Sequence, residues 1–314
     1  MKWLDGDSAR RRLVSTRHRF DHCILTRVPL DLPLSQLSRL ALPALYTLFF
    51  WWFSTGLILH LDGLPARTFR WSLLGATALG VLSLVGLWES RTDPSVFGAY
   101  LAFSCSLLVW GWNEIAFLMG YLTGPRRSAC PPDCRGWPHF RHAVEAILYH
   151  ELALLLSALL IVTVTWGGPN QIGTWTFMVL WGMRISTKLN VFLGVPNLTV
   201  EFLPEGLRYL QSFFSKKPMN GLFPFSITIS TTITLLLLQS AVAAETGPTG
   251  AAGLGFLTTL MALAVLEHWL LVVPLPAASL WSWGLRSRQG REEPERVDPA
   301  SARVAPRPEE ARLR

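Results

Sequence analysis

Charged side chains are scarce in this sequence. Asp, Glu, Lys and Arg account for 16% of its 314 residues, against roughly 25% in an average soluble domain. Hydrophobic residues account for 50%, and the chain contains 14 Trp and 17 Phe. The scarcity of charge excludes an ordinary soluble domain, and the apolar surplus predicts an integral membrane protein.

A nucleic-acid-binding surface is also missing. The formal net charge is +7, but the two strongly basic stretches, the N-terminal arm and the C-terminal tail, lack the interleaved aromatic residues of such a surface. We therefore expect no nucleic-acid partner. The basic residues are better interpreted in terms of membrane topology.

Long apolar segments occupy most of the chain. Seven of them approach the roughly 20 residues that a helix needs to cross the hydrocarbon core. They are residues 41–61, 71–88, 97–118, 147–167, 174–195, 225–243 and 253–275. The fifth is the least apolar, because it contains Arg184 and Lys188. The sequence predicts an all-α, polytopic domain of about seven transmembrane helices within residues 41–280, and it shows no internal repeat of the kind found in many transporters.

The loops predict an orientation. The loops after the first, third and fifth segments, together with the tail after the seventh, carry 17 Lys and Arg residues, whereas the remaining loops carry only Arg91. The positive-inside rule places the N-terminus outside, and it places the C-terminus and loops 119–146 and 185–224 in the cytoplasm. For a bacterial chain this predicts a multi-pass protein of the inner membrane, in contact with the lipid bilayer.

The two ends of the chain do not resemble the middle. Residues 1–40 carry eight Lys and Arg, which conflicts with an outside N-terminus. Either one segment does not span, or this arm is not part of the native protein; we prefer a mis-assigned start and expect the arm to be disordered. Residues 281–314 are rich in Arg, Glu and Pro and are predicted to form a disordered cytoplasmic tail.

A short amphipathic segment lies in the 185–224 loop. Leu207, Leu210 and Phe214 fall on one helical face of residues 204–214, and Pro204 suits a first helical turn. We predict an interfacial helix on the cytoplasmic leaflet. The alternative is an ordinary amphipathic helix that packs on the bundle.

Ionisable residues gather at one depth of the predicted bundle. At 1.5 Å per residue, most of them fall within a band roughly 10 Å deep near the cytoplasmic side. This polar layer consists of Glu114, Glu151, Glu267, His60, His150, His268, Arg184 and Lys188. Such groups are costly in hydrocarbon, so each needs a partner or a function.

Several functions fit the polar layer. It could be a buried network that fixes helix register, or a proton or ion pathway. It could instead bind a cofactor, with His150 or His268 as axial ligand of a haem or bacteriochlorophyll and the carboxylates orienting the imidazole. Metal catalysis has less support: Leu154 stands where the HExxH motif needs its second His, and no Glu-x-x-His pair occurs in the layer.

A second candidate site lies in the loop between the third and fourth segments. Cys130 and Cys134 are followed by His139 and His142, and four such ligands could close a tetrahedral zinc site. The spacing is unusual, so a chance cluster is the alternative. A cytoplasmic loop would keep both thiols reduced, and Cys105, inside the third segment, is expected to be a packing residue.

Five blocks of the chain form a recognisable set: WWFSTGLILHLDGLP (51–65), YHELALL (149–155), RISTKLNVFLGVPN (184–197), EFLPEGLRYL (201–210) and KKPMNGLFP (216–224). Together they resemble the PuhE family, photosynthetic complex assembly proteins of purple phototrophic bacteria. The resemblance extends over about residues 41–280, and STKLNVFLGVPN is its most specific part. The basic arm departs from the family pattern.

The resemblance implies a function but no catalytic residues. It implies a membrane protein that supports biogenesis of the photosynthetic reaction centre and core light-harvesting complex, with a possible effect on bacteriochlorophyll supply. Reaction-centre or light-harvesting subunits and other assembly factors are the implied partners, and turnover chemistry is not expected. The alternative is a membrane metalloenzyme that uses the Glu/His layer on a tetrapyrrole or quinone.

Overall fold

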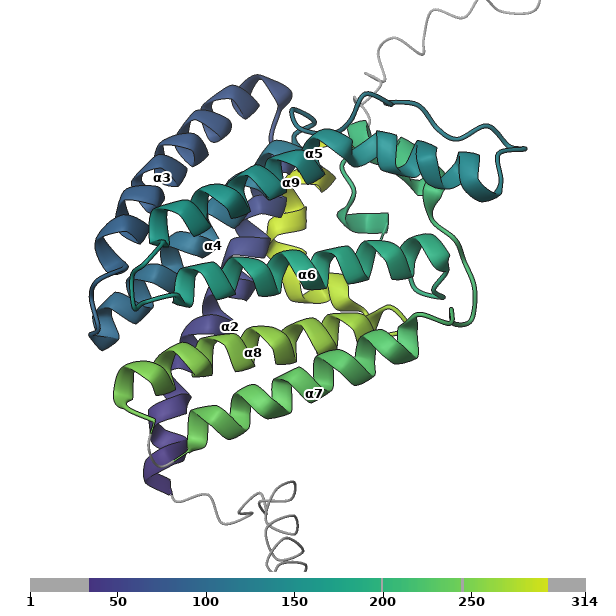
Figure 1. The fold of residues 1–314 in the computed structure, drawn as a ribbon. Helices are drawn as coiled ribbons and strands as arrows, with labels where there is room; N and C mark the ends of the chain where they lie inside the picture. Colours follow the sequence, from purple (N-terminus) through teal and green to yellow (C-terminus); the bar gives the residue numbers. More distant parts are fainter. Residues whose placement is uncertain (1–33, 199, 244–245, 293–314) are drawn as a thin grey trace, which may run out of the picture.

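The chain folds into a bundle of helices (Figure 1). The computed structural model describes residues 34–198, 200–243 and 246–292, and no strand occurs in them. The α-helices are α2 (Leu34–Gly63), α3 (Phe69–Ser90), α4 (Val96–Leu118), α5 (Gly136–Thr165), α6 (Ile172–Leu193), α7 (Phe223–Val242), α8 (Pro248–Leu270) and α9 (Ser282–Glu292). The short 3-10 helices are η1 (Ala66–Thr68), η2 (Val200–Phe202), η3 (Glu205–Phe213) and η4 (Ala277–Trp281).

Six helices in the described part of the chain are long and apolar enough to cross a membrane. They are α2 from Ser38, α3 with η1, α4, α5, α7 and α8. This confirms the prediction of an all-α, multi-pass membrane protein, but it does not confirm a seventh span. Arg184, Lys188 and several Ser, Thr and Asn residues make α6 too polar to qualify, although α6 lies inside the bundle against α4, α5 and α8.

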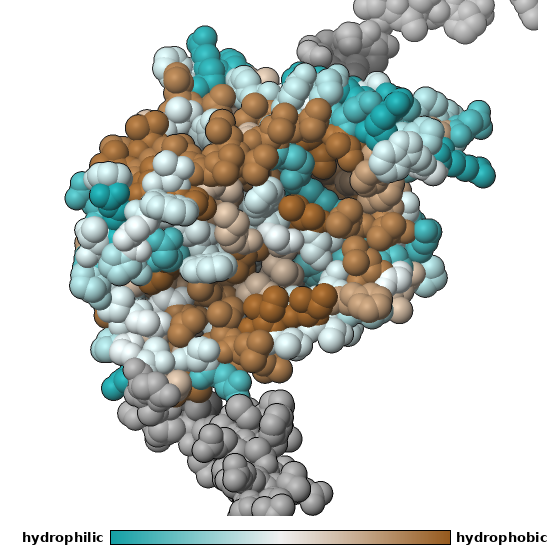
Figure 2. All heavy atoms as spheres, in the orientation of Figure 1, coloured by the Kyte–Doolittle hydropathy of each residue, from teal (hydrophilic) through white to brown (hydrophobic). Residues whose placement is uncertain are grey.

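The exterior of the bundle is apolar over broad areas (Figure 2). Large hydrophobic side chains are exposed along α3, α5 and α7, including Leu82 at 65%, Leu156 at 66% and Phe225 at 66%. Hydrophilic residues gather around the end where α5 begins. Exposed apolar faces of this extent fit contact with lipid tails, so the lipid-facing surface and the polar end agree with a membrane bundle.

The interior is packed by small and aromatic residues. One buried cluster joins α3, α4, α5 and α6 around Phe177, and includes Cys105 in the packing role expected of it. A second joins α4 and α8 through Phe103 and Phe256, whose rings stack with centroids 4.4 Å apart. The α6 residues in these two clusters lie within 172–181, so apolar contacts hold the part of α6 that precedes Arg184 and Lys188.

The described structure changes the boundaries of both predicted tails. α2 begins at Leu34, so residues 34–40 of the predicted arm are helical, and residues 281–292 form the end of η4 and α9 rather than a disordered tail. Trp281 is buried, and Arg288 of α9 donates hydrogen bonds to Asp62 of α2 at 2.7–3.1 Å. The remaining predicted tail residues, 1–33 and 293–314, lie outside the described residues.

The predicted interfacial helix is a 3-10 helix that packs on protein. Leu207, Leu210 and Phe213 of η3 are buried against Phe117 and Ala146. A 3-10 helix has three residues per turn, so the buried residues recur every three positions, and Phe213 rather than Phe214 completes the face. The structure therefore favours the alternative that the segment packs on the bundle.

We predict that α9 docks on α2 through a pair of glycines. A Cβ atom at Gly284 would overlap the carbonyl oxygen of Gly56, and backbone atoms cannot move aside at little cost. Gly284→Ala should cost about 1–3 kcal/mol of stability, the usual cost of overpacking, and should expose Arg286 and Arg288 to trypsin. The thermal unfolding midpoint in detergent and limited proteolysis measure these effects.

Gly75→Ala is the matched control for this prediction. Gly75 is also helical, but a Cβ there would meet nothing within 4 Å. Equal unfolding midpoints and equal cleavage in the two variants would show that α9 does not depend on this close approach.

Candidate functional site

The centre of the polar layer is an ion pair between α4 and α6. Arg184 Nη2 donates to Glu114 Oε2 at 2.8 Å. Arg184 also interacts electrostatically with Glu267 and Glu151. The structure therefore brings Glu114, Glu151 and Glu267 close enough to Arg184 to interact with it, while the membrane depth of these groups stays a prediction.

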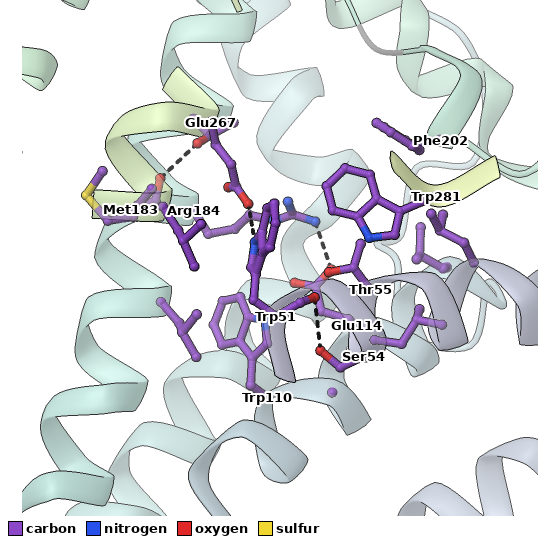
Figure 3. Close-up of a pocket in the computed structure, with 18 of the residues that line it drawn as sticks. Trp51, Ser54, Thr55, Trp110, Glu114, Met183, Arg184, Phe202, Glu267 and Trp281 are labelled. Atoms are coloured by element: carbon purple, nitrogen blue, oxygen red, sulfur yellow. Dashed lines mark hydrogen bonds and ion pairs between the residues drawn. The ribbon is translucent and has the colours of Figure 1, made fainter. Parts of the chain in front are cut away.

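This ion pair faces a cavity of about 380 Å³ (Figure 3). Its walls come from α2, α4, α6 and α8, and further lining residues come from η4 and the loop region before α7: Leu198, Phe202, Leu203 and Phe214. Glu114, Arg184 and Glu267 are its ionisable groups, and Trp51, Trp110 and Trp281 supply much of its aromatic surface. Because Arg184 faces this space, 41% of its side chain is accessible, compared with 8% for Glu114.

The other two acids of the layer have different partners. Glu267 Oε1 accepts a hydrogen bond from Trp51 Nε1 at 2.7 Å, which joins α8 to α2. Glu151 Oε1 lies 2.5 Å from Lys188 Nζ, which joins α5 to α6, and neither residue lines the cavity. The three carboxylates are therefore distributed among three helix contacts.

His268 is held on both sides by protein. Its Nδ1 lies 2.8 Å from the carbonyl oxygen of Ala264, which can only accept, so Nδ1 carries the proton. Its Nε2 lies 2.8 Å from Ser186 Oγ. This side chain is fully buried and has no nitrogen left for a ligand, so its contacts fix the register of α8 against α6.

His150 is buried without such contacts. Neither ring nitrogen has a hydrogen-bond partner among the described residues, and the ring packs against Phe117 with centroids 4.4 Å apart. Its backbone N–H donates to the carbonyl of Thr123 at 3.0 Å. This loop contact needs Gly124, where a Cβ would overlap the carbonyl of Glu145. His150 does not line the cavity.

The third imidazole of the layer is not joined to the network by any described side-chain contact. His60 contributes its backbone carbonyl, which accepts from Ser287 Oγ of α9. In the described part of the chain, no group of three or more His, Cys, Asp or Glu ligand atoms converges in the layer. The acids are separated because each contacts a different partner.

Three residues of the Cys/His loop converge, because the ligand atoms of Cys130, Cys134 and His139 all lie within 4.8 Å of one another, and His142 approaches both sulfur atoms. The Sγ atom of Cys130 lies 3.2 Å from His139 Nδ1 and 3.7 Å from His142 Nδ1. The Sγ atom of Cys134 lies 3.2 Å from His142 Nδ1. Desolvation and the neighbouring Cys134 thiol raise the pKa of the Cys130 thiol to about 11, and nearby Arg126 acts in the opposite direction.

Sequence reasoning missed residues that the structure places around the cavity. Trp51 and Trp281 line it, and their rings lie 5.0 Å apart. Asp62 and Arg288 tie α9 to α2. A buried Asp at the end of a span needs a basic partner. The partner of Asp62 is Arg288, which lies in a segment whose composition predicts disorder.

We predict strong coupling between Arg184 and Glu114. Arg184→Gln leaves a mostly buried carboxylate unpaired, at a cost on the order of 2 kcal/mol, less than for a fully enclosed pair because Arg184 is partly accessible. Adding Glu114→Gln should recover part of this loss. A double-mutant cycle on thermal unfolding in detergent measures the coupling energy.

The exposed pair Arg141–Glu145 is the control for this cycle. Its atoms lie 3.3 Å apart at i,i+4, and 63% of the Arg141 side chain is accessible, so its coupling should be about 0.5 kcal/mol or less. A coupling energy for Arg184–Glu114 no larger than that would mean that solvent in the cavity screens the pair.

Comparison with known proteins identifies the family. Residues 37–292 match the family model described as "Protein of unknown function (DUF3623)". A Rhodobacter capsulatus relative, described as an uncharacterized 30.4 kDa protein in the puhA 5' region, is 42% identical over 252 residues, which cover 78% of this chain and 91% of the relative. No solved structure matches the chain. These matches are consistent with the PuhE-like photosynthesis-operon protein that the sequence resembles, and the chain belongs to the DUF3623 family.

Proposed function

We propose that this protein is a membrane assembly factor for the photosynthetic reaction centre and core light-harvesting complex. The observation that carries the proposal is the relative named for the puhA 5' region, which this chain matches over 91% of that relative's length. A match of this extent includes the whole bundle and the loops at its polar end. The activity proposed here therefore belongs to the common fold of both proteins.

The distribution of polar groups supports a role exercised through protein contacts. The acids of the polar layer are occupied by Arg184, Lys188 and Trp51, so they stabilise helix contacts rather than stand free for chemistry. The apolar faces of α3, α5 and α7 can be covered by lipid or by the transmembrane helices of a partner. Reaction-centre and light-harvesting subunits are the partners that we propose for these faces.

The basic loops support an orientation in the inner membrane. Arg126, Arg127 and Arg135 lie in the loop before α5, Arg141 lies in its second turn, and Lys216 and Lys217 precede α7. By the positive-inside rule, this end of the bundle faces the cytoplasm, with the N-terminus outside and the C-terminus inside. The polar end would then be accessible to newly made subunits on the cytoplasmic side.

Direct bacteriochlorophyll handling is a finer proposal, and His150 is the residue that supports it. Both of its ring nitrogens lack a partner among the described residues, although they are fully buried, and a neutral imidazole is an ordinary axial ligand of tetrapyrrole metals. Ligation at His150 requires the Phe117 ring to move. His268 does not support this proposal, because both of its nitrogens are already bonded.

A membrane metalloenzyme that acts on a tetrapyrrole or quinone is the alternative function. Glu114 Oε1 supports it in one respect, because this buried oxygen has no hydrogen-bond partner in the described chain. However, a metal in the layer would have to displace Arg184, Lys188 and Trp51 from the carboxylates. The assembly role needs no such rearrangement.

Complementation in Rhodobacter capsulatus tests the assembly role. Deletion of the gene for the relative should lower the near-infrared absorbance of reaction centre and core antenna several-fold, and this chain should restore it. Arg184→Gln should restore less, because it disrupts the bundle. Arg91→Gln should restore fully, because Arg91 lies directly after α3 and is not part of the polar layer. Immunoblots of reaction-centre subunits and of the chain itself separate lost assembly from lost protein. Unchanged absorbance in the deletion strain would overturn the proposal.

The absorption spectrum of the purified protein tests pigment handling. Protein isolated in mild detergent from phototrophically grown cells should show a chlorophyll-type band that disappears in His150→Ala and persists in His268→Ala. A colourless wild-type preparation would contradict direct pigment binding and leave an assembly role through protein contacts alone.

A further inference from the structure

We propose that Cys130, Cys134, His139 and His142 form a structural zinc site that fastens the α4–α5 loop to the polar end of the bundle. This site is independent of the polar layer and of the proposed assembly function. Three observations support the site: the convergence of the ligand side chains, their burial in an exposed loop, and the packing beneath them.

The distances fit one tetrahedral ion. Zinc bonds of about 2.3 Å to sulfur and 2.0–2.1 Å to nitrogen place neighbouring ligand atoms roughly 3.3–3.8 Å apart in a tetrahedron. The three recorded sulfur–nitrogen distances are 3.2, 3.2 and 3.7 Å. The ligand atoms of Cys130, Cys134 and His139 all lie within 4.8 Å of one another. Small shifts of the side chains would place all four atoms around one ion.

The backbone presents the ligands from two adjoining elements. His139 and His142 stand three residues apart in the first turns of α5, so they share one helical face. Cys130 and Cys134 flank a turn in which the Cys134 N–H donates to the Pro131 carbonyl at 3.0 Å. Gly136, with a φ of 62°, adopts the left-handed conformation that reverses the chain between the cysteines and the histidines.

Burial distinguishes the four ligands from their neighbours. Residues 131–133, 135–138 and 141 are exposed, whereas all four ligands are half-buried and turned toward the same point. A solvated loop with a chance collection of Cys and His would not withdraw these four side chains. Two thiolates with two imidazoles are the ligand set of closed structural zinc sites, which leave no open position for catalysis.

The site lies on a cluster that also borders the cavity. The Cys130 N–H donates to Ser212 Oγ at 2.9 Å, and the His139 ring packs on Phe192 and Phe213 with centroids 5.4 and 5.7 Å apart. Phe213 belongs to the cluster formed by η3, α4 and α5, and Phe117 of this cluster also lines the cavity. Zinc would therefore hold the loop and η3 in place over one end of the cavity.

Metal analysis of the full chain tests this proposal. The protein is expressed with a non-histidine affinity tag, purified in detergent under reducing conditions, and analysed by inductively coupled plasma mass spectrometry. We expect one zinc per chain in the wild type, and its loss in the Cys130→Ser/Cys134→Ser variant. Cys105→Ser is the matched control, because this cysteine is buried between helices far along α4 from the loop, and it should retain the metal.

A cobalt spectrum keeps the test decisive if the double variant fails to fold. Wild-type protein reconstituted with Co²⁺ should show the intense visible bands of a tetrahedral ion together with thiolate-to-cobalt charge transfer. The bound ion should also protect two thiols from alkylation until a chelator is added. Absence of zinc from the wild type, equal zinc in the double variant, or a Cys130–Cys134 disulfide under reducing conditions would each overturn the proposal. Iron in place of zinc would overturn the assignment of the metal.

Discussion

The position of one cation, Arg184, governs the arrangement of this bundle. An unpaired guanidinium cannot remain in hydrocarbon without a cost of several kcal/mol, so α6 must lie where other helices supply acids. α4 supplies Glu114 directly, and α5 supplies Glu151 to the neighbouring Lys188. The apolar clusters around Phe177 and Phe256 pack against the first half of α6. α6 therefore packs against α4, α5 and α8, and exposed apolar faces lie on α3, α5 and α7.

The same polar residues divide into two functional classes. Most of the layer holds helices together: Glu267 binds Trp51, His268 binds Ser186, and Glu151 binds Lys188. Two buried groups of the layer have no hydrogen-bond partner among the described residues, Glu114 Oε1 and the His150 ring. Phe117 packs on the His150 ring and, like Glu114, lines the cavity. A ligand of the cavity and a ligand of His150 would therefore both act through the position of Phe117.

The Cys/His loop is joined to the polar end of the bundle. The loop lies between α4 and α5, and its contacts with Ser212 and Phe213 connect it to η3. Under the assembly role and the zinc site proposed above, a closed metal site would order a short loop that has few apolar residues of its own and would give partners a defined surface. The apolar exterior and this polar end are two distinct surfaces of the protein.

The sequence by itself determined the class of protein and the position of most spans. These features depend on the local apolar content of each segment. Only the tertiary structure decided the pairing of Arg184 with Glu114, the packing of the His150 ring on Phe117, the packing of η3 and the docking of α9 through Arg288. Each of them depends on which faces of distant helices meet, and composition carries no information about helix rotation. The tail shows this most clearly, because residues 281–292 are polar enough to predict disorder and are ordered by Asp62 and Gly56 on a helix more than two hundred residues earlier in the chain.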